Sequence, residues 1–164
     1  MADSQPAVPD RIEQQIAIAA PLERVWRAVA DDREFGAWFG VKLEAPFVAG
    51  RPCAGRITHP GYEHLRLEVV VQAVEPPTRL AFTWHPFAID PDEDYSREPS
   101  TLVEFRLETA PGGTRLTVTE TGFSRIPAQR RAAAFEANRG GWAQQVVNLD
   151  EYVRGARAPG HAGS

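Results

Sequence analysis

Cysteine and lysine are almost absent from this sequence. Cys53 is the only cysteine among 164 residues, which excludes a disulfide within the chain and a zinc site built on several cysteines. Lys42 is the only lysine among 18 basic residues, so the chain relies on arginine for positive charge. That preference is typical of proteins encoded by GC-rich bacterial genomes and carries no information about mechanism.

An excess of positive charge and a long apolar run are also missing. The 18 basic residues are outnumbered by 22 acidic ones, and the net charge of −4 argues against nucleic-acid binding, which needs clustered positive charge. No apolar stretch approaches the roughly 20 residues of a membrane-spanning helix. The first residues lack the basic and apolar regions of a signal peptide. We therefore expect a cytoplasmic protein with no membrane span and no nucleic-acid partner.

The sequence has the pattern of one α+β domain between two short tails. Residues 1–10 and 155–164 are small and polar, and we expect both tails to be disordered. Residues 11–154 should form a single domain. It begins with a strand over residues 11–19, followed by a helix that Pro21 opens and a second short helix that Asp31 caps. Apolar residues then alternate with a period of two up to residue 121, which predicts about six further antiparallel strands.

A long helix is predicted at the end of the domain, over residues 127–153. Its apolar face consists of Phe135, Trp142, Val146, Leu149 and Val153. This helix should cover the apolar face of the sheet, because the sequence offers no other long helix. Gly140 and Gly141 lie in its middle, where each costs up to about 1 kcal/mol relative to alanine. They predict a kink or break near residues 139–141, so that the segment consists of two helices.

Four segments resemble a known family. They are IAIAAPLERVWRAVADDREFGAWF, VVVQAVEPPTRLAFTW, LVEFRLETAPGGTRLTVTETGF and the Gly141-Trp142 pair with Leu149. Together they resemble the START-like (SRPBCC) superfamily, which includes the birch-pollen allergen and the polyketide cyclases. Within it the chain is similar to the prokaryotic branch named after the heat-shock-protein-ninety ATPase activator. Many members carry a histidine four residues before the helix tryptophan, where this chain has Asn138.

The resemblance covers about residues 12–153 and implies the helix-grip fold. In that fold a curved antiparallel sheet of about six to seven strands wraps around a long C-terminal helix, and two short helices follow the first strand. The space between sheet and helix is concave and mostly apolar, which is typical of small-molecule sites. The candidate ligand-binding residues are Trp38, Phe39, Leu67, Val69, Phe82, Trp84, Phe105, Val118, Glu120, Phe123, Phe135, Trp142 and Val146. The same side chains could instead fill an ordinary core.

Glu120 is the most informative polar candidate. It continues the alternation of Leu116 and Val118, so it should point into the concave face, where a carboxylate must be hydrogen-bonded, paired or protonated. One interpretation is a general base that works with His59 or His85. The other is a structural partner for an arginine or a tryptophan N–H. No spacing of histidines and carboxylates completes a metal site, and no nucleotide-binding motif occurs, so we expect no metal and no cofactor.

Three functions agree with this pattern. The first is non-catalytic binding of a small hydrophobic ligand, aromatic or lipid-like, with the acidic, proline-rich loop over residues 85–100 as a mobile lid. The second is a cyclase, dehydratase or hydrolase that uses Glu120 with His59 or His85. The third is a chaperone-related or other protein-interaction module. An open sheet edge also makes a homodimer possible.

Overall fold

The computed structural model describes residues 9–88, 90 and 92–155, and it confirms the predicted α+β helix-grip architecture. Seven strands form one antiparallel sheet in the order β1-β7-β6-β5-β4-β3-β2. The strands are β1 (Arg11–Ile18), β2 (Val41–Leu43), β3 (Pro52–Ile57), β4 (Arg66–Glu75), β5 (Arg79–Trp84), β6 (Thr101–Ala110) and β7 (Gly113–Thr121). The first strand pairs with the last, so β1 and β2 are the two edge strands of the sheet.

The helices occupy the predicted places. They are α1 (Leu22–Ala30), α2 (Asp32–Phe39), the 3-10 turn η1 (Phe123–Arg125) and α3 (Ala128–Val153). Pro21 lies at the N-cap of α1, where its missing N–H costs nothing. The side chain of Asp31 accepts a hydrogen bond from the Glu34 backbone N–H at 3.0 Å, which confirms the predicted cap of α2.

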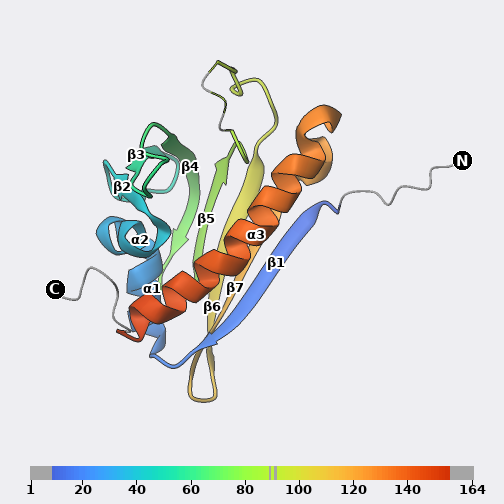
Figure 1. The fold of residues 1–164 in the computed structure, drawn as a ribbon. Helices are drawn as coiled ribbons and strands as arrows, with labels where there is room; N and C mark the ends of the chain where they lie inside the picture. Colours follow the sequence, from blue (N-terminus) through green and yellow to red (C-terminus); the bar gives the residue numbers. More distant parts are fainter. Residues whose placement is uncertain (1–8, 89, 91, 156–164) are drawn as a thin grey trace, which may run out of the picture.

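The core lies between the sheet and α3 (Figure 1). α3 crosses the concave face of the sheet, and α1 and α2 close the side next to β2 and β3. The alternation predicted for the strands is present: along β4, for example, Leu67, Val69 and Val71 are buried while the intervening side chains are exposed. The loop between β5 and β6 projects beyond the sheet at the end where α3 begins. This loop and the first turns of α3 therefore lie at the same end of the fold.

The predicted break in α3 is wrong. Residues Ala128–Val153 form one uninterrupted helix, which Figure 1 shows as a single rod. A Cβ added at Gly140 or Gly141 would meet no atom within 4 Å, so the glycines do not serve a close approach of the sheet either. Buried residues anchor both halves of the helix, with Ala134 and Phe135 on one side of the pair and Trp142 and Val146 on the other. This packing outweighs the weak helix propensity of two glycines.

Two further expectations concern the tails of the chain and the absence of a membrane span. The disorder predicted for residues 1–8 and 156–164 lies outside the described residues. Asp10 itself is held in place, because its side chain accepts hydrogen bonds from the Ser124 backbone N–H at 3.0 Å and the Ser124 hydroxyl at 2.6 Å. Within the part of the chain that the structure describes, no helix combines the length and apolar character needed to cross a membrane.

Candidate functional site

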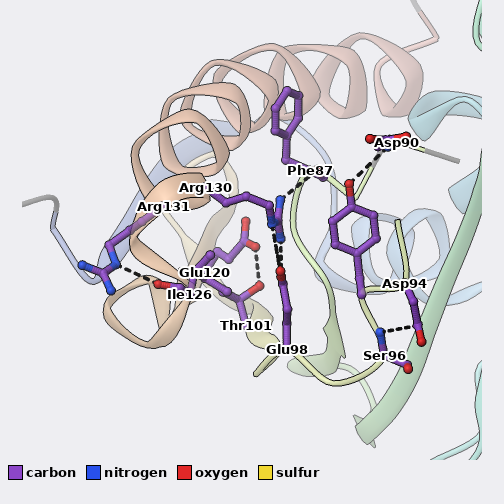
Figure 2. Close-up of polar contacts among 11 residues, drawn as sticks. Phe87, Asp90, Asp94, Ser96, Glu98, Thr101, Glu120, Ile126, Arg130 and Arg131 are labelled. Carbon is purple, nitrogen blue, oxygen red and sulfur yellow. Dashed lines mark hydrogen bonds and ion pairs between the residues drawn. The ribbon is translucent and has the colours of Figure 1, made fainter. Parts of the chain in front are cut away.

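The most concentrated polar contacts of the core surround Glu120. Its side chain is fully buried on β7, as the alternation predicted. Trp84 Nε1–H donates to Oε2 at 2.7 Å, and Trp142 Nε1–H donates to Oε1 at 2.8 Å. The Thr101 hydroxyl donates to Oε2 at 2.6 Å, a contact drawn in Figure 2, and Asn138 Nδ2 donates to both oxygens at 3.0 and 3.1 Å. Five hydrogen bonds therefore converge on one carboxyl group.

These donors join three separate parts of the fold. Trp84 ends β5, Thr101 begins β6, and Asn138 and Trp142 lie one turn apart on α3. Glu120 consequently fastens the helix to the sheet at one point. The rings of Trp84 and Trp142 lie stacked at this point, with centroids 5.8 Å apart and an interplanar angle of 29°. Because a charge-assisted hydrogen bond contributes about 1.5–3 kcal/mol, the cluster is a major determinant of how α3 sits on the sheet.

On the interior side of Trp142 the core is filled. Trp38, Phe105 and Trp142 surround a space there that has no room for a water molecule. The Phe105 ring packs edge-to-face against Trp142 at 5.7 Å and against Trp38 at 6.3 Å. Trp38 Nε1–H donates to the Ala28 carbonyl at 2.9 Å, so this buried indole is also satisfied. At this place the interior between the sheet and α3 is therefore packed protein.

A separate cleft, lined in part by Trp84, opens toward solvent. Its volume is about 400 Å³, and it lies between the β3–β4 turn, the loop after β5 and α3. Leu65, Leu67, Trp84 and Phe87 contribute apolar wall, and Asn138 of α3 also lines the cleft. The cleft therefore combines an apolar and aromatic wall with a larger number of polar and charged residues: Arg66, Glu68, His85, Glu93, Asp94, Tyr95, Ser96 and Asn138.

A smaller groove adjoins the cleft along α3. It has a volume of about 160 Å³ and is lined by Phe39, Trp84, Asn138, Gly141, Trp142 and Gln145. Trp84 and Asn138 line both spaces, so the two share a wall. Gly141 faces this groove with nothing within 4 Å of a Cβ. The groove owes part of its width to the missing side chain.

Arg130 of α3 holds the loop between β5 and β6 (Figure 2). Its guanidinium forms a bidentate pair with Glu98, with the shortest distance 2.7 Å, and donates to the Phe87 carbonyl at 3.0 Å. The same group lies 4.7 Å from the centre of the Tyr95 ring. The side chains of Arg130 and Glu98 are only 16% and 18% exposed, so this pair is less screened than a surface ion pair. One arginine thus contacts the loop at three points.

Phe87 in this loop has an unusual backbone. Its φ of 53° places a non-glycine residue in the left-handed region, which β-carbon sterics disfavour. The residue is 36% exposed and lines the cleft. Such strain persists where the surrounding contacts impose it, and the hydrogen bond from Arg130 to the Phe87 carbonyl is such a contact. The loop therefore presents an aromatic side chain to the cleft.

The structure divides the predicted ligand-binding residues into three groups. Leu67, Trp84, Phe39 and Trp142 line the cleft or the groove. Trp38, Phe105, Val118 and Val146 surround the filled interior. The remaining residues line neither opening: Val69, Phe82, Glu120, Phe123 and Phe135. Phe135 packs against Phe123 with ring centroids 5.3 Å apart.

The histidines and the cysteine are placed as follows. His85 lines the cleft, whereas His59 lies exposed on the β3–β4 turn, 5.5 Å from the Tyr62 ring. The hydrogen bonds that Glu120 makes with described residues come from the four donors above and from neither histidine. No group of metal-ligating side chains occurs among the described residues. Burial raises the pKa of the Cys53 thiol, which is consistent with a small apolar core residue.

Several residues of the site were not evident from the sequence. Thr101 and Asn138 carry no pattern that links them to Glu120, because they belong to other elements. Arg130 likewise carries no pattern that links it to the loop over residues 85–100. The one available signal was that two tryptophan N–H groups needed buried acceptors and Glu120 was a buried acceptor.

Comparisons with known proteins agree with this architecture. The profile of the family described as "Activator of Hsp90 ATPase homolog 1-like protein" matches residues 19–154. Protein MLL2253 from Mesorhizobium loti has a similar structure, with 28% identity and a TM-score of 0.69 over 88% of this chain and 96% of that chain. Protein SSP2350 from Staphylococcus saprophyticus shares the fold, with 21% identity and a TM-score of 0.67 over 91% of this chain and 97% of that one.

A third solved structure is DynU16, from the dynemicin biosynthetic locus. It is 27% identical with a TM-score of 0.69, and the match covers 90% of this chain but 48% of DynU16. This chain therefore spans about half the length of that protein. No curated protein matches the sequence.

Proposed function

Because this chain belongs to the family of Activator of Hsp90 ATPase homolog 1-like proteins, with its helix-grip fold, we propose that it binds a small, largely apolar ligand in the cleft beside α3 and catalyses no reaction. The observation that carries this proposal is the cleft of about 400 Å³ at the open end of the fold. That volume is within the range of about 300–1,000 Å³ found for small-molecule sites. We also propose that the protein functions in the bacterial cytoplasm.

The wall of the cleft supports an aromatic ligand over a long lipid chain. Trp84 and Phe87 offer aromatic surface, and Leu65 and Leu67 offer aliphatic surface. A long acyl chain would need a tunnel that continues into the interior, yet the space between the sheet and α3 below Trp142 is filled. A compact ligand is therefore the better fit.

The surroundings of Glu120 support binding over catalysis. A general base needs a free lone pair within reach of its substrate. Both oxygens of Glu120 already accept hydrogen bonds. The donors are Trp84, Thr101, Asn138 and Trp142, and the side chain of Glu120 is fully buried. The carboxylate is thus explained by a structural role behind the wall of the cleft.

The protein-interaction alternative has weaker support. A docking surface of this kind needs a contiguous exposed apolar patch. The large apolar side chains that are most exposed come from different segments: Val48, Tyr62, Val70, Phe87 and Val147. β1 and β2 are the edge strands of the sheet. A homodimer formed by pairing of two copies through an edge strand stays a prediction.

A dye titration tests the proposal. Nile red, a neutral apolar fluorophore, should bind one site on the protein and brighten on leaving water. Leu65→Trp places a large ring in the cleft and should weaken the dye's binding at least tenfold, about 1.4 kcal/mol. Tyr62→Trp is the matched control, because Tyr62 belongs to the same turn, is 52% exposed and does not line the cleft.

Two results would count against the proposal. Nile red that fails to bind, or that binds the Leu65→Trp and Tyr62→Trp variants equally, would remove the cleft as its site. Native mass spectrometry of the protein purified from its natural source provides an independent check. A retained small molecule there would identify the ligand directly.

A further inference from the structure

The two edge strands of the sheet differ in how well they are protected. An edge strand exposes unpaired backbone N–H and C=O groups, and proteins protect such edges with short strands, lysine, proline or β-bulges. β2 has these features, because it is three residues long, carries Lys42 and is followed by Pro46. β1 is eight residues long, contains neither proline nor lysine, and pairs with β7 without a register shift. Its two charged residues, Arg11 and Glu13, form an ion pair with each other. Figure 1 shows β1 at the border of the sheet with no labelled helix or strand beyond it, so β1 is the unprotected edge.

The backbone groups that β1 presents outward follow from its pairing with β7. In an antiparallel pair, residues that exchange hydrogen bonds alternate with residues whose backbone groups point away from the neighbouring strand. The Gly122 N–H donates to the Asp10 carbonyl at 3.1 Å, so the even-numbered residues of β1 direct their backbone groups toward β7. Among the described residues, β1 pairs with no other strand. The residues with outward-facing N–H and C=O groups are Arg11, Glu13, Gln15 and Ala17, and all four are exposed.

A second copy of β1 matches this edge in one register. With an antiparallel twofold axis at Gln14, Arg11 lies opposite Ala17 of the second copy, and Glu13 lies opposite Gln15 of the second copy. All four outward-facing residues of each strand then exchange hydrogen bonds. An axis at Glu13 would place two carboxylates opposite each other, which is unfavourable. An axis at Gln15 would leave Arg11 beyond the end of the other strand.

The side chains also agree with this register. On the outer face, the carboxylate of Glu13 can accept a hydrogen bond from the amide of Gln15 of the second copy. On the concave face, Ile12 lies opposite Ile16 of the second copy, and the two Gln14 amides meet at the axis. Ile16 is only partly buried within one copy, where it packs against the core. The pairing would therefore cover apolar surface of Ile16 as well as backbone.

We propose that two copies of this chain form a dimer by antiparallel pairing of β1 with β1, across a twofold axis at Gln14. The two seven-stranded sheets become one continuous sheet. A contact that uses the same patch on both copies is closed, so it ends at the dimer and covers the unprotected edge of each copy. Residues 11–18 line neither the cleft nor the groove, so the interface leaves the proposed ligand site accessible.

Sedimentation equilibrium of the full chain tests the proposal. The unaltered protein should have twice the mass of one chain over a concentration series. Gln15→Pro removes an outward-facing N–H that β7 does not use, and proline is tolerated on an edge strand, so this variant should be a folded monomer. Gln15→Thr keeps the N–H and should stay dimeric. Circular dichroism of both variants checks that they are folded.

Charges at position 15 test the register. Gln15 lies opposite Glu13 of the second copy, and the pair occurs twice by symmetry. Gln15→Lys should therefore tighten the dimer roughly three- to tenfold, and Gln15→Glu should weaken it by a similar factor. A general effect of charge at a sheet edge would weaken the dimer in both variants.

A cysteine at the axis gives a direct measure of contact. Opposite residues that exchange no hydrogen bonds have Cα atoms about 4.5 Å apart in an antiparallel pair, which a disulfide can bridge. Gln14→Cys should therefore form a covalent dimer under mild oxidation. Gln72→Cys is the matched control, because Gln72 is exposed on β4 in the middle of the sheet. The native Cys53 is buried and does not interfere.

Three results would overturn the β1 dimer. They are a monomer at every concentration up to the solubility limit, a dimer that persists in folded Gln15→Pro, and equal cross-linking of the two cysteine variants. A change of the same sign in Gln15→Lys and Gln15→Glu would overturn the axis at Gln14. If Gln15→Pro fails to fold, the unaltered protein, the charge variants and the cross-linking still decide. Nile red binding is a separate measurement, so the proposed function stands or falls independently.

Discussion

Replacing Gly140 or Gly141 by alanine should stabilise the protein. Both glycines lie inside the continuous helix α3, are exposed, and leave open space where a Cβ would be. Glycine is less favourable than alanine in a helix interior by about 0.8–1 kcal/mol. Each substitution acts through helix propensity at its own position, and neither Cβ would meet another part of the chain within 4 Å, so the double variant should gain up to about 2 kcal/mol.

Urea unfolding followed by circular dichroism measures this gain. The midpoint should rise in each single variant and rise further in the double variant, with an unchanged slope against urea concentration. For a domain of this size, about 2 kcal/mol corresponds to roughly 4–8 °C in Tm. A fall in stability in either single variant would show that the helix is distorted at that glycine in solution, which would revive the kink and refute the uninterrupted α3.

The same pair of glycines separates stability from function. Gly141 lines the groove of about 160 Å³, whereas Gly140 lines neither opening. Gly141→Leu fills the groove and should weaken Nile red binding, while Gly140→Leu should leave it unchanged. Equal affinities in the two variants would confine the dye to the larger cleft. A residue that costs stability and keeps a binding surface open fits the general trade-off between the two.

Three further changes have expected outcomes. Glu120→Gln replaces one acceptor oxygen with a donor and should lower the free energy of unfolding by roughly 2 kcal/mol. Glu120→Leu leaves four donors without an acceptor and should lower it by roughly 4 kcal/mol or more. Both values are measured by urea unfolding, and equal losses would contradict the hydrogen-bond account. Arg130→Ala should speed amide exchange over residues 92–100 and leave the middle of α3 protected, and ligand-independent exchange in the loop would argue against a lid. Hydrogen bonds from the Ser124 hydroxyl and N–H lower the pKa of Asp10 below its ordinary value of 3.8. The ionised Asp10 therefore stabilises the fold above pH 3.8, and this contribution is lost as the pH falls through the lower pKa of the folded protein. Asp10→Asn should reduce stability at neutral pH, and the variant and the parent should become equally stable in acid.

The sheet and the burial of Glu120 followed from local patterns. Alternation along one strand fixes which side chains share a face, and Leu116, Val118 and Glu120 are all buried on β7 as that rule requires. The caps and turns are similarly local, which is why the start of α2 at Asp31 was predictable. Each of these features depends on residues only a few positions apart.

The partners of Glu120 could not be predicted in this way. Its donors lie between 18 and 36 positions away, on β5, β6 and α3, so their convergence is a property of the tertiary structure. The predicted break in α3 failed for a related reason. Propensity counts the cost of Gly140 and Gly141, but it does not count the burial of Phe135 and Trp142 on either side of them.

The stacked pair Trp84 and Trp142 sets the depth to which a ligand can enter. On one side of the pair the interior is filled by Phe105 and its neighbours, and on the other side the cleft and the groove are open. Glu120 holds both indole N–H groups at once, so neither ring can swing aside without leaving a buried donor unpaired. Because that cost of about 1–3 kcal/mol per donor opposes opening the interior, the two tryptophans act as a floor. Selectivity should therefore reside in the side chains that line the cleft and the groove on the open side of the two tryptophans.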